Sequence, residues 1–113
     1  MRTFRASVAA GESGPLIGLT GEADITNAAE LSELITGRLA GGTLHLTVDV
    51  AGLDFADTAA IRVFILAAKT LRQRGGDLVL LRPQPTLARV LEILGVDEKV
   101  MAIRGKPTQA TRL

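Results

Sequence analysis

The residues best suited to chemistry in this chain are an aspartate and a threonine, Asp57 and Thr58, which directly precede a long apolar segment. Asp57 is a favourable helix N-cap, because its carboxylate can accept hydrogen bonds from free amides at the positive end of the helix dipole. Thr58 then takes the first helical position with its hydroxyl directed outward. These two residues alone favour a structural cap, at a helix start that also tolerates a phosphate on the threonine.

Histidine chemistry and phosphate-binding loops are not supported elsewhere in the sequence. The single histidine, His45, falls in the middle of a predicted strand, which argues against a histidine triad and against a multi-histidine metal site. Glycine pairs occur at 41–42 and 75–76, but each follows a predicted helix, where glycine is typical of a helix end. No Walker or dinucleotide-binding glycine pattern is present.

Paired carboxylates are the remaining catalytic possibility. Asp54 lies three positions before Asp57, and Glu22 lies two before Asp24. Without a substrate pocket to accompany them, such acids on loops are typical of capping or solvated groups. We therefore expect no enzyme activity, no metal and no cofactor.

Length and composition indicate one domain. The chain has 113 residues, a mass of 11.9 kDa and 47% hydrophobic residues, enough for a single well-formed core. The absence of cysteine fits a reducing compartment, and the N-terminus lacks the apolar run of a signal peptide. The longest apolar run, 63–68, is too short to cross a bilayer, so we expect a cytoplasmic protein without membrane insertion.

The charge pattern argues against nucleic-acid binding. The formal net charge is +1, although residues 61–113 carry ten basic side chains against four acids. Single-stranded nucleic acids need aromatic stacking platforms, and the chain has three phenylalanines with no tryptophan or tyrosine. We therefore expect that the chain does not bind nucleic acid.

Turn signals and hydrophobic periodicity divide the chain into alternating elements. Strands are predicted at 3–8, 16–19, 43–50 and 77–82, with 99–103 either a last edge strand or an irregular return. Helices are predicted at 28–39, 57–74 and 86–94, and the apolar residues of 57–74 cover most of its surface. Residues 51–56 are predicted as a loop, and 105–113 as a flexible polar tail.

This order predicts an α/β fold with a mixed sheet of four to five strands packed against three to four helices. The unit from 43 to 82 is long enough for a right-handed crossover between parallel strands. Ligands of open α/β sheets gather at the carboxyl ends of parallel strands. The segment 51–57 and the start of the second helix lie at that edge.

Three stretches, in this order and spacing, resemble a known family, the STAS domains, and in particular the small stand-alone anti-sigma factor antagonists. The first resembles the family's early signature, Leu19-Thr20-Gly21-Glu22-Ala23-Asp24. The second, 48–61, is similar to its central Asp-Ser-Ser-Gly or Asp-Ser-Thr-Gly motif, and the third runs from the Gly75–Leu80 segment through Pro83 to 87–96. The resemblance covers about residues 4–103, and it implies one STAS-like domain over 1–113.

The resemblance also implies a mechanism. In such antagonists the hydroxyl residue after the motif's aspartate is phosphorylated by an anti-sigma factor that is itself an ATP-dependent serine/threonine kinase. The unphosphorylated form binds that kinase and frees the sigma factor, and a metal-dependent phosphatase restores it. By position, Thr58 matches the phosphoacceptor, Asp57 its acidic neighbour, and Asp24 the acid on the adjacent loop, while Ala59 and Ala60 fall in the partner-binding motif.

The chain departs from this pattern at three positions. Thr58 replaces the commoner serine, Ala59 replaces serine or threonine, and Ala60 places a Cβ where the family keeps glycine and an open backbone. The alternative role is therefore a scaffold that is never phosphorylated, such as the STAS subunit of a transport ATPase or of a signalling assembly.

Overall fold

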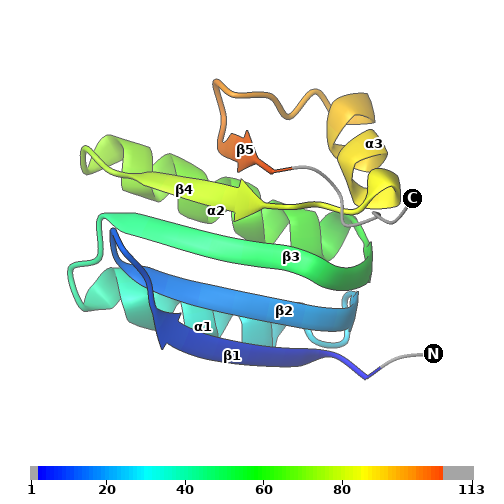
Figure 1. The fold of residues 1–113 in the computed structure, drawn as a ribbon, viewed down its shortest axis with the longest axis horizontal. Coiled ribbons are helices and arrows are strands. Elements are labelled where there is room, and N and C mark those ends of the chain that lie inside the picture. Colours follow the sequence, from blue (N-terminus) through cyan, green and yellow to red (C-terminus); the bar gives the residue numbers. More distant parts are fainter. Residues whose placement is uncertain (1–2, 106–113) are drawn as a thin grey trace.

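The computed structural model describes residues 3–105, which form five strands and three helices in the order β1-β2-α1-β3-α2-β4-α3-β5 (Figure 1). The strands are β1 (Arg5–Ala10), β2 (Pro15–Ala23), β3 (His45–Ala56), β4 (Asp77–Leu81) and β5 (Ala102–Arg104). The helices are α1 (Ala28–Ala40), α2 (Thr58–Gln73) and α3 (Pro85–Ile93). The predicted α/β class, with five strands and three helices, is confirmed.

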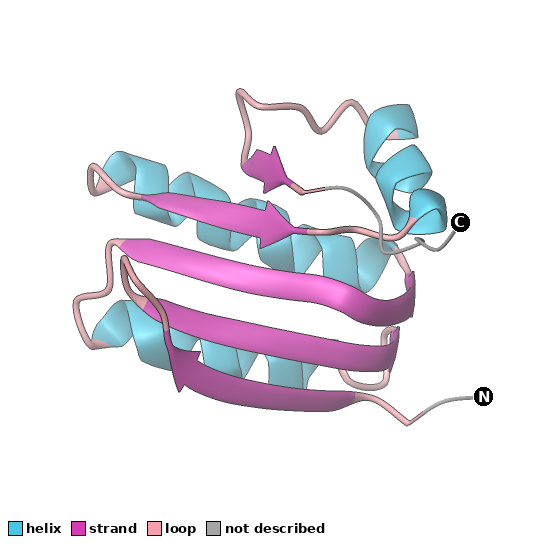
Figure 2. Ribbon diagram, in the orientation of Figure 1, coloured by secondary structure: helices cyan, strands magenta, loops and turns pink. Residues whose placement is uncertain are grey.

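The strands form one mixed sheet whose spatial order equals their order in the chain. β1 pairs antiparallel with β2, and every later pair is parallel. Helices α1 and α2 lie side by side on one face of the sheet, while α3 lies near its carboxyl edge (Figures 1 and 2). The ambiguous segment near residue 100 therefore supplies a short strand, parallel to β4.

The core lies between the sheet and helices α1 and α2. Alternate residues of β2 and β3 are buried on the helix side, as period-two burial requires. The largest fully buried side chains come from the sheet and from all three helices: Ile17, Leu19, Leu31, Ile35, Leu46, Leu53, Ile61, Phe64, Leu71, Leu78, Leu80 and Leu91. Within residues 3–105 no polar or charged side chain is buried.

The predicted loop at 51–56 is wrong, because these residues continue β3. They pair with the end of β2 through Thr20 with Gly52 and Ala23 with Ala56, with one register shift between Gly21 and Glu22. The small residues and the acid in this stretch weaken its own strand propensity, and pairing with β2 outweighs that preference. The longer strand carries the sheet directly to Asp57.

β1 differs from the expected half-buried strand. All six of its side chains are exposed, although Val8 and its neighbours alternate in polarity. A strand at the edge of a sheet gains cover from one neighbouring strand only. Phe4, just before the strand, is half-buried and packs against the core.

Helix α2 begins and ends where its sequence predicts. Asp57 is its N-cap, and the helix stops before Gly75, which has φ +84°. A Cβ on Gly76 would lie 1.9 Å from the carbonyl oxygen of Leu44, so this second glycine allows the chain to pass β3 closely. The two glycines thus turn the chain into β4.

Helix α3 starts at Pro85, at a first-turn position that suits proline. Of its predicted apolar stripe, Leu87 and Leu91 are buried, whereas Val90 and Leu94 are substantially exposed. The predicted tail at 105–113 lies outside the described residues except for Gly105.

Candidate functional site

Asp57 connects two loops at the carboxyl edge of the sheet. Its carboxylate accepts hydrogen bonds from the backbone N–H of Ala60 at 3.1 Å and from that of Ile25 at 3.1 Å. Its own N–H donates to the carbonyl of Ala23 at 3.0 Å. The end of β2 and the start of α2 are therefore held together by one residue, and the expected N-cap is confirmed.

Asp24 organises the loop that follows β2. Its carboxylate accepts hydrogen bonds from both the N–H and the hydroxyl of Thr26, and its N–H donates to the side-chain oxygen of Asn27 at 2.9 Å. The Asn27 amide donates in turn to the carbonyl of Glu22 at 3.1 Å. The Thr26 hydroxyl is the main cause of a lowered Asp24 pKa, so this acid stays ionised well into the acidic range.

The loop after β2 is attached to the start of α2, so the carboxylates of Asp24 and Asp57 lie at the same edge of the sheet. Asn27 precedes α1 as its N-cap, but its side chain is engaged within the loop and caps no helical N–H. The loop is attached to Asp57 through Ile25, which places Asp24 and Asp57 on the same rim of the sheet. This hydrogen bond joins the loop that carries Asp24 to the residue that precedes Thr58, and the role of the two acids stays a prediction.

Thr58 is the first residue of α2 and its side chain is exposed. Its hydroxyl makes no hydrogen bond to any residue in 3–105. The first intrahelical hydrogen bond of α2 runs from the N–H of Ile61 to the carbonyl of Asp57. Of the N–H groups before it, the N–H of Ala60 donates to the Asp57 carboxylate, whereas those of Thr58 and Ala59 have no partner within the helix. The hydroxyl is accessible at the positive end of a helix.

Ala60 is placed differently from what its motif position suggests. Its side chain is fully buried in the core, so its methyl group does not reach the surface. Ala59 is half-buried at the rim. Of the two alanines that we expected at a partner surface, only Ala59 is accessible.

An open groove of about 380 Å³ runs from Thr58 along α2. Arg62 and Lys69 contribute cations to it, while Leu66 and Leu94 contribute apolar surface from α2 and from the end of α3. Leu66 is 57% exposed and Leu94 45%. We call the surface formed by Thr58, Arg62, Leu66, Lys69 and Leu94 the α2 groove.

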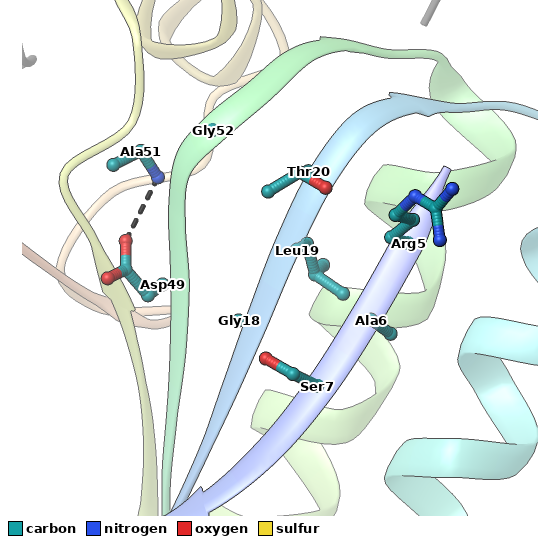
Figure 3. A pocket seen from close by; sticks show the side chains of 9 residues that line it. All are labelled: Arg5, Ala6, Ser7, Gly18, Leu19, Thr20, Asp49, Ala51 and Gly52. Atoms are coloured by element: carbon teal, nitrogen blue, oxygen red, sulfur yellow. Dashed lines mark hydrogen bonds between the residues drawn. The ribbon is translucent and has the colours of Figure 1, made fainter. Parts of the chain in front are cut away.

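A second hollow, of about 430 Å³, lies on the sheet face opposite α1 and α2 (Figure 3). Arg5 and Ser7 of β1 line it, together with Thr20 and Asp49. The Asp49 carboxylate already accepts bonds from the N–H of Ala51 and from Arg82. Neither of these two bonds joins Asp49 to a hydroxyl of the hollow, and residues 3–105 hold no cluster of potential metal ligands.

Sequence reasoning singled out Thr58 but missed the other residues of the α2 groove and the apolar residues near Asp57. Two exposed apolar residues near Asp57 carry no signal in the sequence: Ile25, 76% exposed, whose N–H bonds to the Asp57 carboxylate, and Phe55, 50% exposed, two positions before it. Arg62 lies four positions after Thr58 and so shares its side of the helix, a spacing that could have been read from the sequence. The exposure of Leu66 could not have been read from the sequence, because it depends on where α3 lies.

An exposed groove that combines apolar and cationic side chains thus lies beside the accessible Thr58 hydroxyl. The chain belongs to the STAS-domain family: the family model described as "Mlab, STAS domain" matches residues 6–104. The resemblance proposed from the sequence is confirmed.

Two relatives carry regulatory names. The chain is 35% identical over 77 residues to BtrV of Bordetella bronchiseptica, a candidate anti-sigma factor antagonist. The aligned region covers 68% of this chain and 66% of that protein. The chain is 38% identical over 96 residues to Rv2638 of Mycobacterium tuberculosis, a candidate anti-anti-sigma factor. Here the aligned region covers 83% of this chain and 65% of that protein. The chain thus spans slightly less than two thirds of the length of these relatives.

Solved structures share the fold. A crystal structure of an anti-sigma factor antagonist from Mycobacterium paratuberculosis superimposes with a TM-score of 0.81 at 18% identity, covering 94% of this chain and 87% of that one. The Bacillus protein SpoIIAA in its phosphorylated form gives 0.69 at 20% identity, covering 91% and 92%.

These comparisons also bear on the broader expectations. The names of these two relatives are those of regulators of sigma factors rather than of enzymes. Of the helices within residues 3–105, none combines the length and apolar character that a membrane span requires.

Proposed function

We propose that this protein is a cytoplasmic anti-sigma factor antagonist that acts by partner switching through Thr58. The unphosphorylated form binds an anti-sigma factor that is also a serine/threonine kinase, and so frees the sigma factor. Transfer of the γ-phosphoryl group of ATP to the Thr58 hydroxyl releases ADP and a proton and dissociates the complex. A metal-dependent phosphatase removes the phosphate and restores binding.

The observation that carries this proposal is the exposed and unbonded Thr58 hydroxyl at the start of α2. A kinase can reach it without unfolding the domain. The N–H groups of the first turn and the helix dipole favour added negative charge there. The names of the two relatives support the same role.

Phosphorylation would change the surface more than the fold. A phosphate adds about −1.5 to −2 charges on the rim that already carries Asp57 and Asp24. Arg62, one turn further along α2, is positioned to pair with part of that charge. The domain therefore tolerates the phosphate, whereas a partner docked over Thr58 meets new bulk and repulsion.

The α2 groove supplies the docking area in this proposal. Leu66 and Leu94 expose apolar surface in this groove, and two further exposed apolar residues, Ile25 and Phe55, lie at the carboxyl ends of β2 and β3. A partner that covers these side chains gains hydrophobic contact and surrounds the hydroxyl. A phosphate on Thr58 then lies inside the interface rather than at its margin.

The decisive experiment incubates the purified protein with ATP and each candidate anti-sigma factor kinase from its own genome. Mass spectrometry should locate one phosphate on Thr58, and a Thr58→Val protein should acquire none. Isolated phosphoprotein should bind the kinase more weakly than the unmodified protein does. A protein that binds a partner yet never carries phosphate at Thr58 would instead have the scaffold role, in a transport ATPase or a signalling assembly.

A further inference from the structure

The outer edge of β1 is open to another strand. β1 lies at the end of the sheet order and pairs only with β2 among the described residues. Natural edge strands are commonly protected by proline, by central charges or by bulges. Arg5, at its first position, carries the only charge in β1, and the other five residues are alanine, serine or valine.

The free backbone groups of this edge can be identified from the hairpin. The N–H of Gly11 donates to the carbonyl of Gly14 at 2.8 Å, which directs the backbone groups of Gly11 toward β2. Because these groups alternate in direction along a strand, those of Ala6, Val8 and Ala10 point away from the sheet. Three residues in register therefore offer both a donor and an acceptor.

Helix α1 lies beside this edge and carries a polarised row of charges. A groove of about 400 Å³ lies between Ala6 and α1. Glu30 and Glu33 line it near the start of the helix, and Arg38 lines it near the end. The groove is therefore acidic at one end and basic at the other.

We propose that a second copy of this chain binds here, with the two β1 strands antiparallel and centred on Val8. Val8 then faces its counterpart, Ala6 faces Ala10 of the second copy, and the two Arg5 side chains lie at opposite ends. The two sheets become one sheet of ten strands, and the interface is self-complementary, as a two-fold dimer requires. This is an interaction surface separate from the α2 groove.

Charge complementarity supports a second copy as the occupant. The two-fold axis that aligns the strands also sets the α1 helices antiparallel. Glu30 and Glu33 of one copy then lie on the side of Arg38 of the other, and the reverse contact forms as well. An unrelated extended peptide would bond to the free backbone groups of β1, but it would not provide the opposite charges that pair with Glu30, Glu33 and Arg38.

The proposal does not depend on the role of Thr58. In the helix layer α1 lies between the β1 edge and α2, so the dimer leaves the α2 groove uncovered (Figure 1). Loss of dimerisation and loss of partner binding are therefore measured by different variants and different assays.

Sedimentation and light scattering of the full chain over a wide concentration range test the dimer. The expected mass approaches twice 11.9 kDa as concentration rises. Val8→Lys sets two ammonium groups against each other at the two-fold axis and should weaken association about tenfold or more. Val8 is 41% exposed, so circular dichroism should show an unchanged fold. Ser13→Lys adds the same charge in the hairpin turn beyond the strand and should leave association intact.

A charge exchange on α1 distinguishes this dimer from other associations. Arg38→Glu should weaken it, and Glu33→Arg combined with Arg38→Glu should restore it. A chain that stays monomeric at all concentrations would overturn the proposal. A dimer indifferent to Val8→Lys, or one that the charge exchange does not restore, would also overturn it, because its interface would lie elsewhere.

Discussion

The carboxylate of Asp57 accepts a hydrogen bond from the N–H of Ile25, which lies 32 residues earlier in the chain, at 3.1 Å. The same carboxylate caps α2 through Ala60. One side chain therefore couples the loop after β2 to the helix start that carries Thr58. The position of the acidic loop and the orientation of the hydroxyl depend on each other through this residue.

Replacing Asp57 tests that coupling. Asp57→Ala removes an N-cap and leaves the N–H of Ile25 without its acceptor, so it should lower the free energy of unfolding by about 1–2 kcal/mol. Urea denaturation monitored by circular dichroism measures this. Asp57→Asn keeps an acceptor oxygen and should lose less, and equal losses for the two variants would argue against the capping role.

Thr58→Glu should weaken binding to the anti-sigma factor. A fixed negative charge within the interface imitates part of the phosphate, and a coupling of about 3 kcal/mol corresponds to more than a hundredfold in affinity. Isothermal titration calorimetry measures the affinity. Thr58→Val keeps the shape without charge and should bind as wild type does. Wild-type affinity for Thr58→Glu would count against the switch.

Leu66→Asp tests the α2 groove as a docking surface. Because Leu66 is 57% exposed, the change should alter the free energy of unfolding by no more than about 0.5 kcal/mol while weakening partner binding at least about tenfold. Leu44→Asp is the matched control, since Leu44 is 43% exposed and lies before β3 at the opposite edge. Equal effects of the two variants on binding would remove the groove from the interface.

Asp24→Ala should change partner binding or phosphorylation and leave the melting temperature nearly unchanged. The residue is half-buried, and the hydrogen bonds of its carboxylate stay within its own loop, to Thr26 and to the backbone of Asn27. Differential scanning calorimetry and the kinase assay measure the two effects separately. A large drop in melting temperature would instead give Asp24 a structural role.

The lowered pKa of Asp24 has a consequence at acidic pH. Because the folded state holds this pKa below 3.8, ionised Asp24 contributes stability at pH values above its unfolded pKa. That contribution is lost as the pH falls through the lowered folded pKa. An NMR titration of the Asp24 carboxyl should show the depressed midpoint, and Thr26→Val should raise it by removing the hydroxyl donor. An unchanged midpoint in Thr26→Val would assign the shift to another group.

Local signals in the sequence determined the helices, the N-cap and the alternating core strands. Asp57 before an apolar segment, and glycines after it, specify the start and end of α2 through contacts within a few residues. The exposed hydroxyl of Thr58 follows from the same local geometry. These features could be predicted because the groups that produce them are neighbours in the chain.

Only the tertiary structure decided the rest. Residues 51–56 are a strand because β2 pairs with them, and β1 is exposed because it occupies an edge of the sheet. The bond from Ile25 to Asp57 and the exposure of Leu66 likewise depend on segments distant in sequence. Pairing and burial are free energies of contact between such segments, so the residues of one segment cannot determine them alone.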